Sequence, residues 1–162
     1  MEYVDHPKHY NARPDGLECI DIIRHYTFDI GCAIKYLWRA GLKPELGKMY
    51  AEKTIEDLQK AQWYIDDQIY FGIEHDGFAS MNRENVEDLL EMLYRLTGQK
   101  ISDVASFEYY GEHVAQAIFC LLHVGLINDG YVYRAKYAVS MLREARKEIE
   151  ARIEELKKEN EK

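Results

Sequence analysis

The chain has 162 residues, of which 47% are hydrophobic and 31% charged, and its formal net charge is −8. This length suits one compact domain or two small units, and the composition excludes a disordered chain. The negative charge argues against a general nucleic-acid binder, because such a protein presents a basic surface to the phosphates. We therefore expect a globular protein with no nucleic-acid partner.

The three cysteines, Cys19, Cys32 and Cys120, each lie inside an apolar helical pattern. An odd number in such positions predicts buried free thiols in a reducing compartment, not disulfides or a zinc site. No stretch approaches the 18 apolar residues that a membrane span needs, and residues 1–10 lack the apolar core of a signal peptide. We expect a cytoplasmic protein with no membrane partner.

Apolar residues at helical spacing predict six helices, and no segment shows the alternation of a strand. The first runs over 16–26, and the second from an Asp29 cap to a stop at Gly41. The others cover 49–71, 85–97, 107–124 and 131–158, with loops at 1–15 and 42–48 and a linker at 72–82. The predicted fold class is all-α, with a long C-terminal helix.

The two halves of the chain share an apolar pattern at one constant offset in sequence. Ala33, Ile34, Leu37, Gly41, Leu58, Ala61 and Ile65 match Ala117, Ile118, Leu121, Gly125, Leu142, Ala145 and Ile149. We interpret this as two pseudo-repeated three-helix units, 1–72 and 73–162, packed into one helical bundle.

The polar residues of the first unit are not repeated. Lys35, Arg39 and Trp63 correspond to Phe119, His123 and Lys147 in the second unit. Because the apolar scaffold repeats while the polar set does not, we predict that any chemistry lies in residues 1–72. The second unit is then expected to serve structure or assembly.

Residues 6–10 form a dense polar cluster in which His6, Lys8, His9 and Tyr10 surround a proline. Proline limits the entropy that such a segment loses when it organises around a ligand. The cluster suits anion binding or the handling of a proton or phosphoryl group. The alternative is a solvated tail.

The second predicted helix carries Lys35 and Arg39 four residues apart, hence on one face, and Lys43 follows its end. Three cations beside the rings of Tyr36 and Trp38 could hold a polyphosphate while a ring stacks on a base. The alternative is a basic solvent-facing stripe with Trp38 in the core. From the third helix, Lys60, Trp63 and Tyr64 could form a second wall, although Trp63 could instead be a core residue.

Glu18 and Asp21 share a helix face at a spacing that magnesium-binding carboxylates use in all-helical nucleotide pyrophosphatases. A second carboxylate pair would have to come from Glu52, Glu56 or Asp57, and exposed helices often carry such residues without a metal. Residues 41–49 are no phosphate-binding P-loop, because five residues separate the glycines and Met49 replaces the required Ser or Thr.

Several motifs in order resemble one family. They are V-D-H-P-K-H-Y at 4–10, E-C-I-D at 18–21, A-I-K-Y-L-W-R-A-G at 33–41, D-L at 57–58, K-A at 60–61 and W-Y at 63–64. The family is a group of small SaV-like phage proteins of unknown function, with an H-P-x-H-Y opening and an I-K-Y-L-W-R-x-G core. One member is a phage nucleotide kinase without a P-loop. Residues 71–162 match no known pattern.

The resemblance implies a nucleoside monophosphate kinase in the host bacterial cytoplasm, with nucleotides as partners. The high aromatic content, with 13 tyrosines, and the small size of the units lead us to expect a homo-oligomer. The resemblance puts His6, His9, Lys35 and Arg39 in catalytic roles, and Lys8, Tyr10, Tyr36, Trp38, Lys43, Lys60, Trp63 and Tyr64 at the substrate. Lys35 and Arg39 would neutralise phosphates, and a histidine would orient or transiently accept the phosphoryl group. The alternatives are a sponge for nucleotides or cyclic nucleotide immune signals, and a Mg²⁺-dependent pyrophosphatase, for which Mg²⁺ would be the cofactor.

Overall fold

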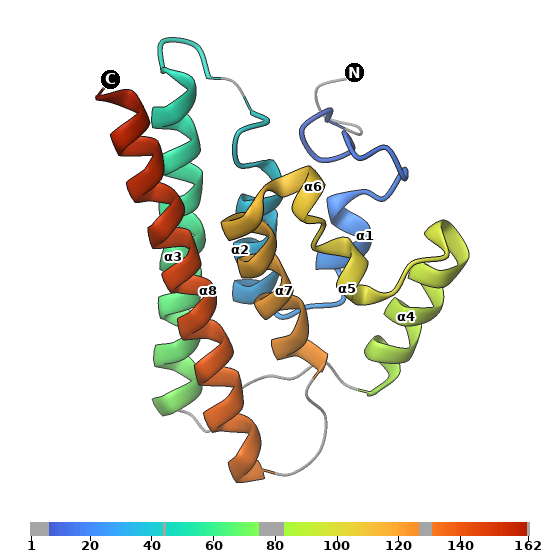
Figure 1. Cartoon of the computed structure of the whole chain (residues 1–162). Helices are drawn as coiled ribbons and strands as arrows, with labels where there is room; N and C mark the ends of the chain where they lie inside the picture. Colours follow the sequence, from blue (N-terminus) through green and yellow to red (C-terminus); the bar gives the residue numbers. More distant parts are fainter. Residues whose placement is uncertain (1–6, 44, 75–82, 127–130, 162) are drawn as a thin grey trace.

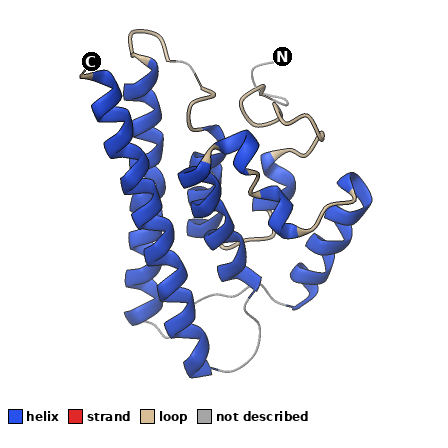
Figure 2. Ribbon diagram, in the orientation of Figure 1, coloured by secondary structure: helices blue, strands red, loops and turns tan. Residues whose placement is uncertain are grey.

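The computed structural model describes residues 7–43, 45–74, 83–126 and 131–161, and these contain helices and no strands (Figures 1 and 2). The all-α prediction is therefore confirmed. The helices are α1 (Cys19–Ile23), α2 (Phe28–Arg39), α3 (Tyr50–Glu74), α4 (Arg83–Thr97), α5 (Ile101–Val104), α6 (Phe107–Tyr110), α7 (Glu112–Leu126) and α8 (Tyr131–Asn160). The predicted long C-terminal helix corresponds to α8. Within these residues no helix is both long enough and apolar enough to cross a membrane.

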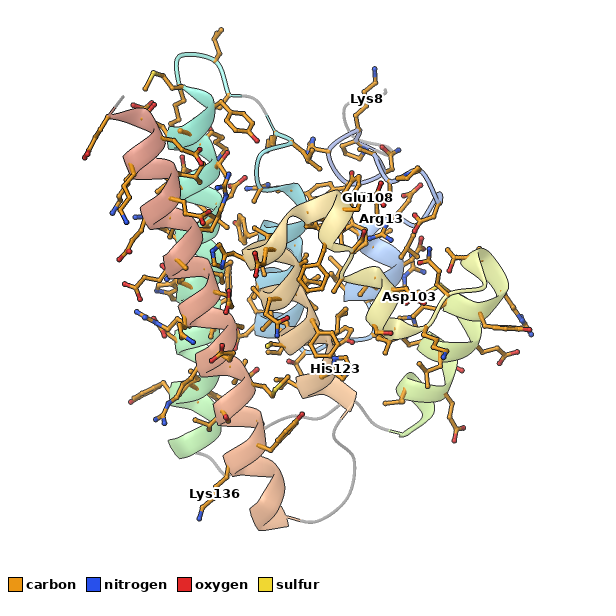
Figure 3. The ribbon with its side chains drawn as sticks, in the orientation of Figure 1. Lys8, Arg13, Asp103, Glu108, His123 and Lys136 are labelled. Atoms are coloured by element: carbon orange, nitrogen blue, oxygen red, sulfur yellow. The ribbon has the colours of Figure 1, made fainter. Side chains whose placement is uncertain are left out.

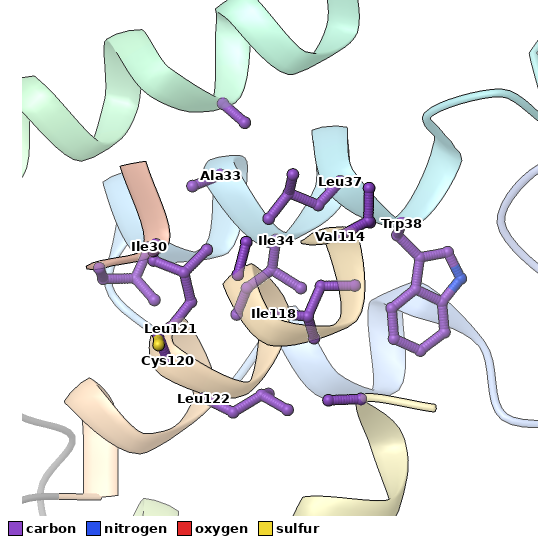
Figure 4. Packing of buried hydrophobic residues seen from close by; sticks show 14 of the residues in the cluster. Ile30, Ala33, Ile34, Leu37, Trp38, Val114, Ile118, Cys120, Leu121 and Leu122 are labelled. Carbon is purple, nitrogen blue, oxygen red and sulfur yellow. The ribbon is translucent and has the colours of Figure 1, made fainter. Parts of the chain in front are cut away.

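Four helices contribute most of the core. α2 packs on α3, α7 packs on α8, and the two pairs meet through α3 on α8 and α2 on α7. Figure 4 shows the contact between α2 and α7, where Ile34 and Leu37 lie close to Ile118 and Leu121. All four side chains are fully buried. Burial of such side chains contributes roughly 1.5–3 kcal/mol each, so this contact is a main source of stability.

The start and end of α2 follow from its flanking residues. The N-cap is Thr27, whose carbonyl accepts a hydrogen bond from the Gly31 amide at 2.8 Å, and not Asp29 as the sequence suggested. Asp29 lies instead in the first turn, where a carboxylate favours the helix dipole. Gly41 follows the helix with φ of +79°, and a Cβ there would lie 2.5 Å from the Tyr50 hydroxyl. A glycine is therefore needed where the chain turns toward α3.

Two predicted helices are shorter in the structure. The helix expected over 107–124 is divided into α6 and α7, because Gly111 adopts φ of +77°. The first helix ends at Ile23 instead of residue 26, and its last residues form turns. One of them, Tyr26, is tied by its hydroxyl to the Leu122 carbonyl of α7 at 2.9 Å. A long-range contact thus replaces the last helical turn.

The apolar positions that match between the two halves are buried in both. Ala33, Ile34, Leu37, Leu58, Ala61 and Ile65 are fully buried, and so are their six counterparts. The helix pairs α2–α3 and α7–α8 also pack against each other, as two copies of one unit could. The repeat itself stays a prediction.

The cysteines are free thiols, with Cys19 and Cys120 buried and Cys32 half-buried. Burial raises the pKa of Cys19 to about 12 and that of Cys120 to about 11. Both thiols are therefore protonated at neutral pH and behave as small apolar core residues.

Candidate functional site

The candidate site lies where α2 and α3 run side by side in opposite directions. Near one end of this pair Thr27 is close to Gln68, in the middle Tyr36 stacks on Tyr64, and at the other end Arg39 meets Asp57. The N-terminal loop approaches this last end. Lys35, Tyr36, Arg39, Lys60 and Tyr64 therefore lie along the line where α2 meets α3.

Arg39 is the centre of a charged network. Its Nε and Nη2 donate to the two oxygens of Asp57 at 3.2 and 2.9 Å, and its Nη1 donates to the Tyr10 hydroxyl at 3.0 Å. Asp57 is fully buried and Arg39 is only 8% exposed. Burial alone would lower the pKa of Arg39, but the bonds to Asp57 and Tyr10 raise it above its ordinary value. A two-point bond of this kind fixes the guanidinium plane.

Lys53 adds a second buried cation to this network. It is 5% exposed, and its Nζ lies 3.2 Å from Asp57 Oδ1, 3.1 Å from Glu45 and 3.4 Å from Glu56. Burial favours its neutral form, but the hydrogen bonds to Glu45 and Asp57 outweigh this and raise its pKa. Lys53 is therefore charged, and one buried carboxylate serves two buried cations.

The N-terminal loop is fixed to α2 through Tyr10. The Tyr10 carbonyl accepts hydrogen bonds from Trp38 Nε1 at 3.2 Å and from the Cys19 amide at 3.0 Å. The His9 ring packs on the Tyr10 ring at 4.3 Å between centroids. These contacts hold His9 beside Arg39.

His9 has a pKa below the ordinary value of 6.5. Partial burial is the main cause, and the positive charges of Lys43 and Arg39 lower the pKa further, while Asp57 opposes them. The imidazole is consequently uncharged at neutral pH. An uncharged imidazole can accept a proton or act as a nucleophile.

The ring of Tyr36 gathers cations from both helices. Arg39 Cζ lies 4.5 Å from the ring centroid, Lys35 Nζ 5.0 Å and Lys60 Nζ 5.8 Å. We call this surface the basic face. It consists of the side chains of Lys35, Arg39, Lys43 and Lys60, which lie around the Tyr36 ring and beside His9. Among the described residues, Lys35 and Lys43 have no carboxylate partner, so their charges are available to an anion.

The remaining cations are held by carboxylates. Glu56 binds both Lys60 and Lys48, and these bonds lower the pKa of Glu56 to about 2. The Lys60 side chain is 40% exposed and its partner sits on the same helix one turn earlier. An exposed pair of this type is weak, so Lys60 can exchange Glu56 for an anionic ligand at little cost.

Tyr64 extends the surface with further rings. It stacks on Tyr36 with an interplanar angle of 18°, and Trp63 and Phe28 contact its edge at 4.9 and 5.9 Å between centroids. Trp63 is 61% exposed, so it is not the core residue that the alternative interpretation described. These rings offer a platform on which a base can stack.

Other predicted residues lie apart from the basic face or outside the described residues. Trp38 is fully buried and packs in the core, as Figure 4 shows. From there its Nε1 donates to the Tyr10 carbonyl. Lys8 is exposed on the loop and points away from the helices in Figure 3. His6 lies outside the described residues.

Glu18 and Asp21, the weak candidates for a metal site, lie at the start of α1. The Glu18 amide, at the N-cap of α1, donates to Asp21, and Asp21 also pairs with Arg24 at 3.6 Å. Within the described part of the chain, no group of three His, Cys, Asp or Glu side chains is placed to hold a metal ion. The Asp21 carboxylate thus has a local role at the start of α1.

Two contributors were not predicted from the sequence. Lys53 could have been found from its spacing, since it lies one turn before Asp57 on the face that meets α2. Arg13 gave no signal: its Nη1 donates to the Val104 carbonyl at 2.6 Å, and its guanidinium lies 5.3 Å from the Trp38 ring centre. Figure 3 shows Arg13 where the N-terminal loop meets the second half of the chain. It fixes the base of the loop that carries His9.

The described residues therefore define an all-helical protein with a buried charged network beneath a basic and aromatic face. Residues 4–66 match the model of a family described as a protein of unknown function, DUF3310. The matched segment is less than half of the chain but spans most of the site, from the N-terminal loop to Tyr64. No curated protein and no solved structure matches the chain.

Proposed function

We propose that the basic face binds nucleotides, and that the protein is a phage nucleoside monophosphate kinase. The observation that carries this proposal is the convergence of Lys35, Lys60 and Arg39 on the Tyr36 ring beside an uncharged His9. Phosphoryl transfer depends mostly on positioning and on charge stabilisation, which such a surface can supply without a P-loop.

Each element has a role in the proposed reaction. Lys35 and Lys60 bind phosphate oxygens, and the ring of Tyr36 or Tyr64 stacks on a base. Arg39 stabilises the negative charge of the phosphoryl group through the N–H groups that are not bonded to Asp57 or Tyr10. Asp57 fixes the orientation of the guanidinium plane. The terminal phosphoryl group of a triphosphate breaks from its bridging oxygen and bonds to a phosphate oxygen of the monophosphate, which yields two diphosphates. His9 orients the acceptor phosphate or takes the phosphoryl group transiently.

The test is incubation of the full chain with nucleoside monophosphates, ATP and Mg²⁺, followed by chromatography for new diphosphates. His9→Gln should abolish diphosphate formation and leave nucleotide binding within a few-fold. His25→Gln is the matched control, since His25 also has a pKa lowered by burial but lies just after α1, where the charges that act on it are Arg24, Asp88 and Asp21. If His9→Gln turned over as fast as wild type, the result would contradict the proposed catalytic role of His9.

The same experiment separates the alternatives. A nucleotide or cyclic nucleotide that is retained tightly and unchanged would indicate sequestration, which needs the cations and rings but no acid–base group. Release of pyrophosphate from a triphosphate, lost in Glu18→Ala/Asp21→Ala, would indicate a pyrophosphatase. The kinase proposal requires this double variant to keep its turnover.

A further inference from the structure

Glu56 lies at the outer edge of the buried charged network and contacts three lysines. Its two oxygens accept hydrogen bonds from Lys60, one turn later on α3, and from Lys48, just before α3 begins. Lys53 Nζ lies 3.4 Å from the oxygen that Lys60 contacts. We call Lys48, Lys53 and Lys60 the lysine cradle. Its three ammonium groups surround one anion, which in this structure is the protein's own carboxylate.

Two of the three lysines are held in place by other carboxylates. The Lys53 side chain is only 7% exposed, and its Nζ also lies 3.2 Å from Asp57 and 3.1 Å from Glu45. Lys48 also pairs with Glu45, at 2.9 Å. Lys48 and Lys53 therefore keep a partner if Glu56 moves away.

Glu56 itself is held at the surface and can move. Its side chain is 31% exposed, and the side chains of Lys48 and Lys60 are 37% and 40% exposed. Exposed ion pairs of this kind contribute little, so Glu56 can turn into solvent with a small loss. The bonds to Lys48 and Lys60 lower the pKa of Glu56 to about 2, so the carboxylate is charged at neutral pH. It therefore competes with any anion for the same ammonium groups.

The lysine cradle borders the basic face. Lys60 belongs to both, since its Nζ lies 5.8 Å from the centroid of the Tyr36 ring, and Asp57 joins Lys53 to Arg39. A phosphate group carries more negative charge than a carboxylate and offers three acceptor oxygens to the three ammonium groups. A ligand with several phosphates can thus extend from the Tyr36 ring into the cradle.

We propose that the lysine cradle is a phosphate subsite and that Glu56 is its internal competitor. The Glu56 carboxylate occupies the position of one phosphate group of a polyphosphate ligand, and it turns into solvent when that ligand binds. The assignment of this ligand to a nucleoside triphosphate rests on the proposed function. Because every ligand has to displace the same carboxylate, Glu56 favours ligands of high charge over anions of low charge, which gain less in exchange.

Glu56→Gln tests the competition by isothermal titration calorimetry of the full chain with inorganic tripolyphosphate. The variant should bind tripolyphosphate about 3- to 30-fold more tightly than wild type, because it removes two weak ion pairs and a negative charge beside the ligand. Glu150→Gln is the matched control. It removes the same charge from an exposed ion pair with Arg146, one turn earlier on α8, and should change the affinity by less than about twofold.

A second pair of variants shows whether the gain arises in the cradle. Lys60→Gln removes the lysine for which Glu56 is the one carboxylate partner in the described part of the chain. In this background Glu56→Gln should raise the affinity less than it does in wild type, because it releases fewer cations. An equal gain in both backgrounds would show that Glu56 acts only through overall charge, and would contradict the proposal.

Two other results would overturn the proposal. One is a Glu56→Gln variant that binds tripolyphosphate no more tightly than wild type, as expected if the carboxylate only positions the lysines. The other is the absence of binding by both proteins at millimolar tripolyphosphate. Circular dichroism shows whether each variant is folded. Because tripolyphosphate carries no base, these results do not decide the kinase proposal, and a lack of new diphosphates in the kinase assay does not decide the competition.

Discussion

The helix pairs α2–α3 and α7–α8 bury similar apolar side chains at matching positions, yet they differ in the charges that they bury. In the first pair Arg39, Asp57 and Lys53 form a network inside the protein. The corresponding positions of the second pair hold His123, Met141 and Tyr137. The charged contacts of the second pair are nearer the surface, such as His113 between Glu148 and Glu155.

This difference supports the proposed site in the first pair. Burying charges is costly, and apolar residues of similar volume often serve stability as well or better. At the corresponding positions of the second pair Tyr137 is exposed and His123 and Met141 are half-buried, so that pair packs without burying any charge there. We infer that the charged network of the first pair is present for what it positions: the guanidinium of Arg39, the hydroxyl of Tyr10 and, through Tyr10, the imidazole of His9.

The largest effect is expected from Asp57→Ala. It leaves Arg39 and Lys53 buried without their shared carboxylate, and breaking a buried pair costs about 3–5 kcal/mol. Asp66→Ala is the control on the same helix, because the ion pair of Asp66 with Arg146 of α8 is half-exposed and should contribute less than about 1 kcal/mol. Urea unfolding measures both values. Equal losses would show that the buried network is not the stabilising feature of the first pair.

The next effect concerns ligand binding by the basic face. Lys35→Gln removes a cation that has no carboxylate partner among the described residues, and should weaken ATP binding by roughly 10- to 100-fold, the range of one charge-assisted hydrogen bond. Lys136→Gln, on the exposed surface of α8, should bind ATP as wild type does (Figure 3). Isothermal titration calorimetry measures both. A similar loss in the two variants would mean that ATP responds only to overall charge.

The smallest effects are pH dependences of opposite sign from the two regions. The hydrogen bond to Glu148 is the main cause that raises the pKa of His113 above 6.5. The folded state therefore holds the proton more tightly, and this stabilisation is complete below pH 6.5 and is lost as pH rises through the higher folded-state pKa. His113→Gln should remove that loss from the pH profile of unfolding free energy. An unchanged profile would show that His113 does not bind a proton more tightly on folding.

His9 should act in the reverse direction. Burial first, then Lys43 and Arg39, lower its pKa below 6.5, so the unfolded state binds the proton more tightly. The protein loses stability as pH falls from 6.5 through the folded-state pKa, and His9→Gln should reduce this loss. The two histidines are distinguished by the pH range in which each variant changes the free energy of unfolding. If His9→Gln changed this free energy only above pH 6.5, the result would contradict the position described for the His9 ring.

The apolar periodicity was sufficient to predict the fold class and most helices, because buried stripes on amphipathic helices determine which faces pack. It could not predict the break at Gly111, since a glycine inside an apolar pattern does not reveal its φ angle. The Tyr26 bond to Leu122 depended on a neighbour that is distant in sequence.

The site was partly predictable for the same reason. Lys35, Tyr36 and Arg39 share a helix face, and the structure brings Lys60 and Tyr64 to them across the α2–α3 contact. The sequence could not show that Arg39 is bound by Asp57, because two residues 18 apart meet only after two helices pack. Nor could it distinguish the exposed Trp63 from the buried Trp38.

The proposed nucleotide site lies where the N-terminal loop meets α2 and α3. Backbone amide NMR spectra of the full chain, recorded during titration with ATP, reveal which residues the nucleotide contacts. We expect shifts of the amides of His9, Tyr10 and residues 35–39 and 57–64, with those of α7 and α8 far less affected. Shifts confined to α7 and α8, or a spectrum that ATP leaves unchanged, would contradict binding at this site.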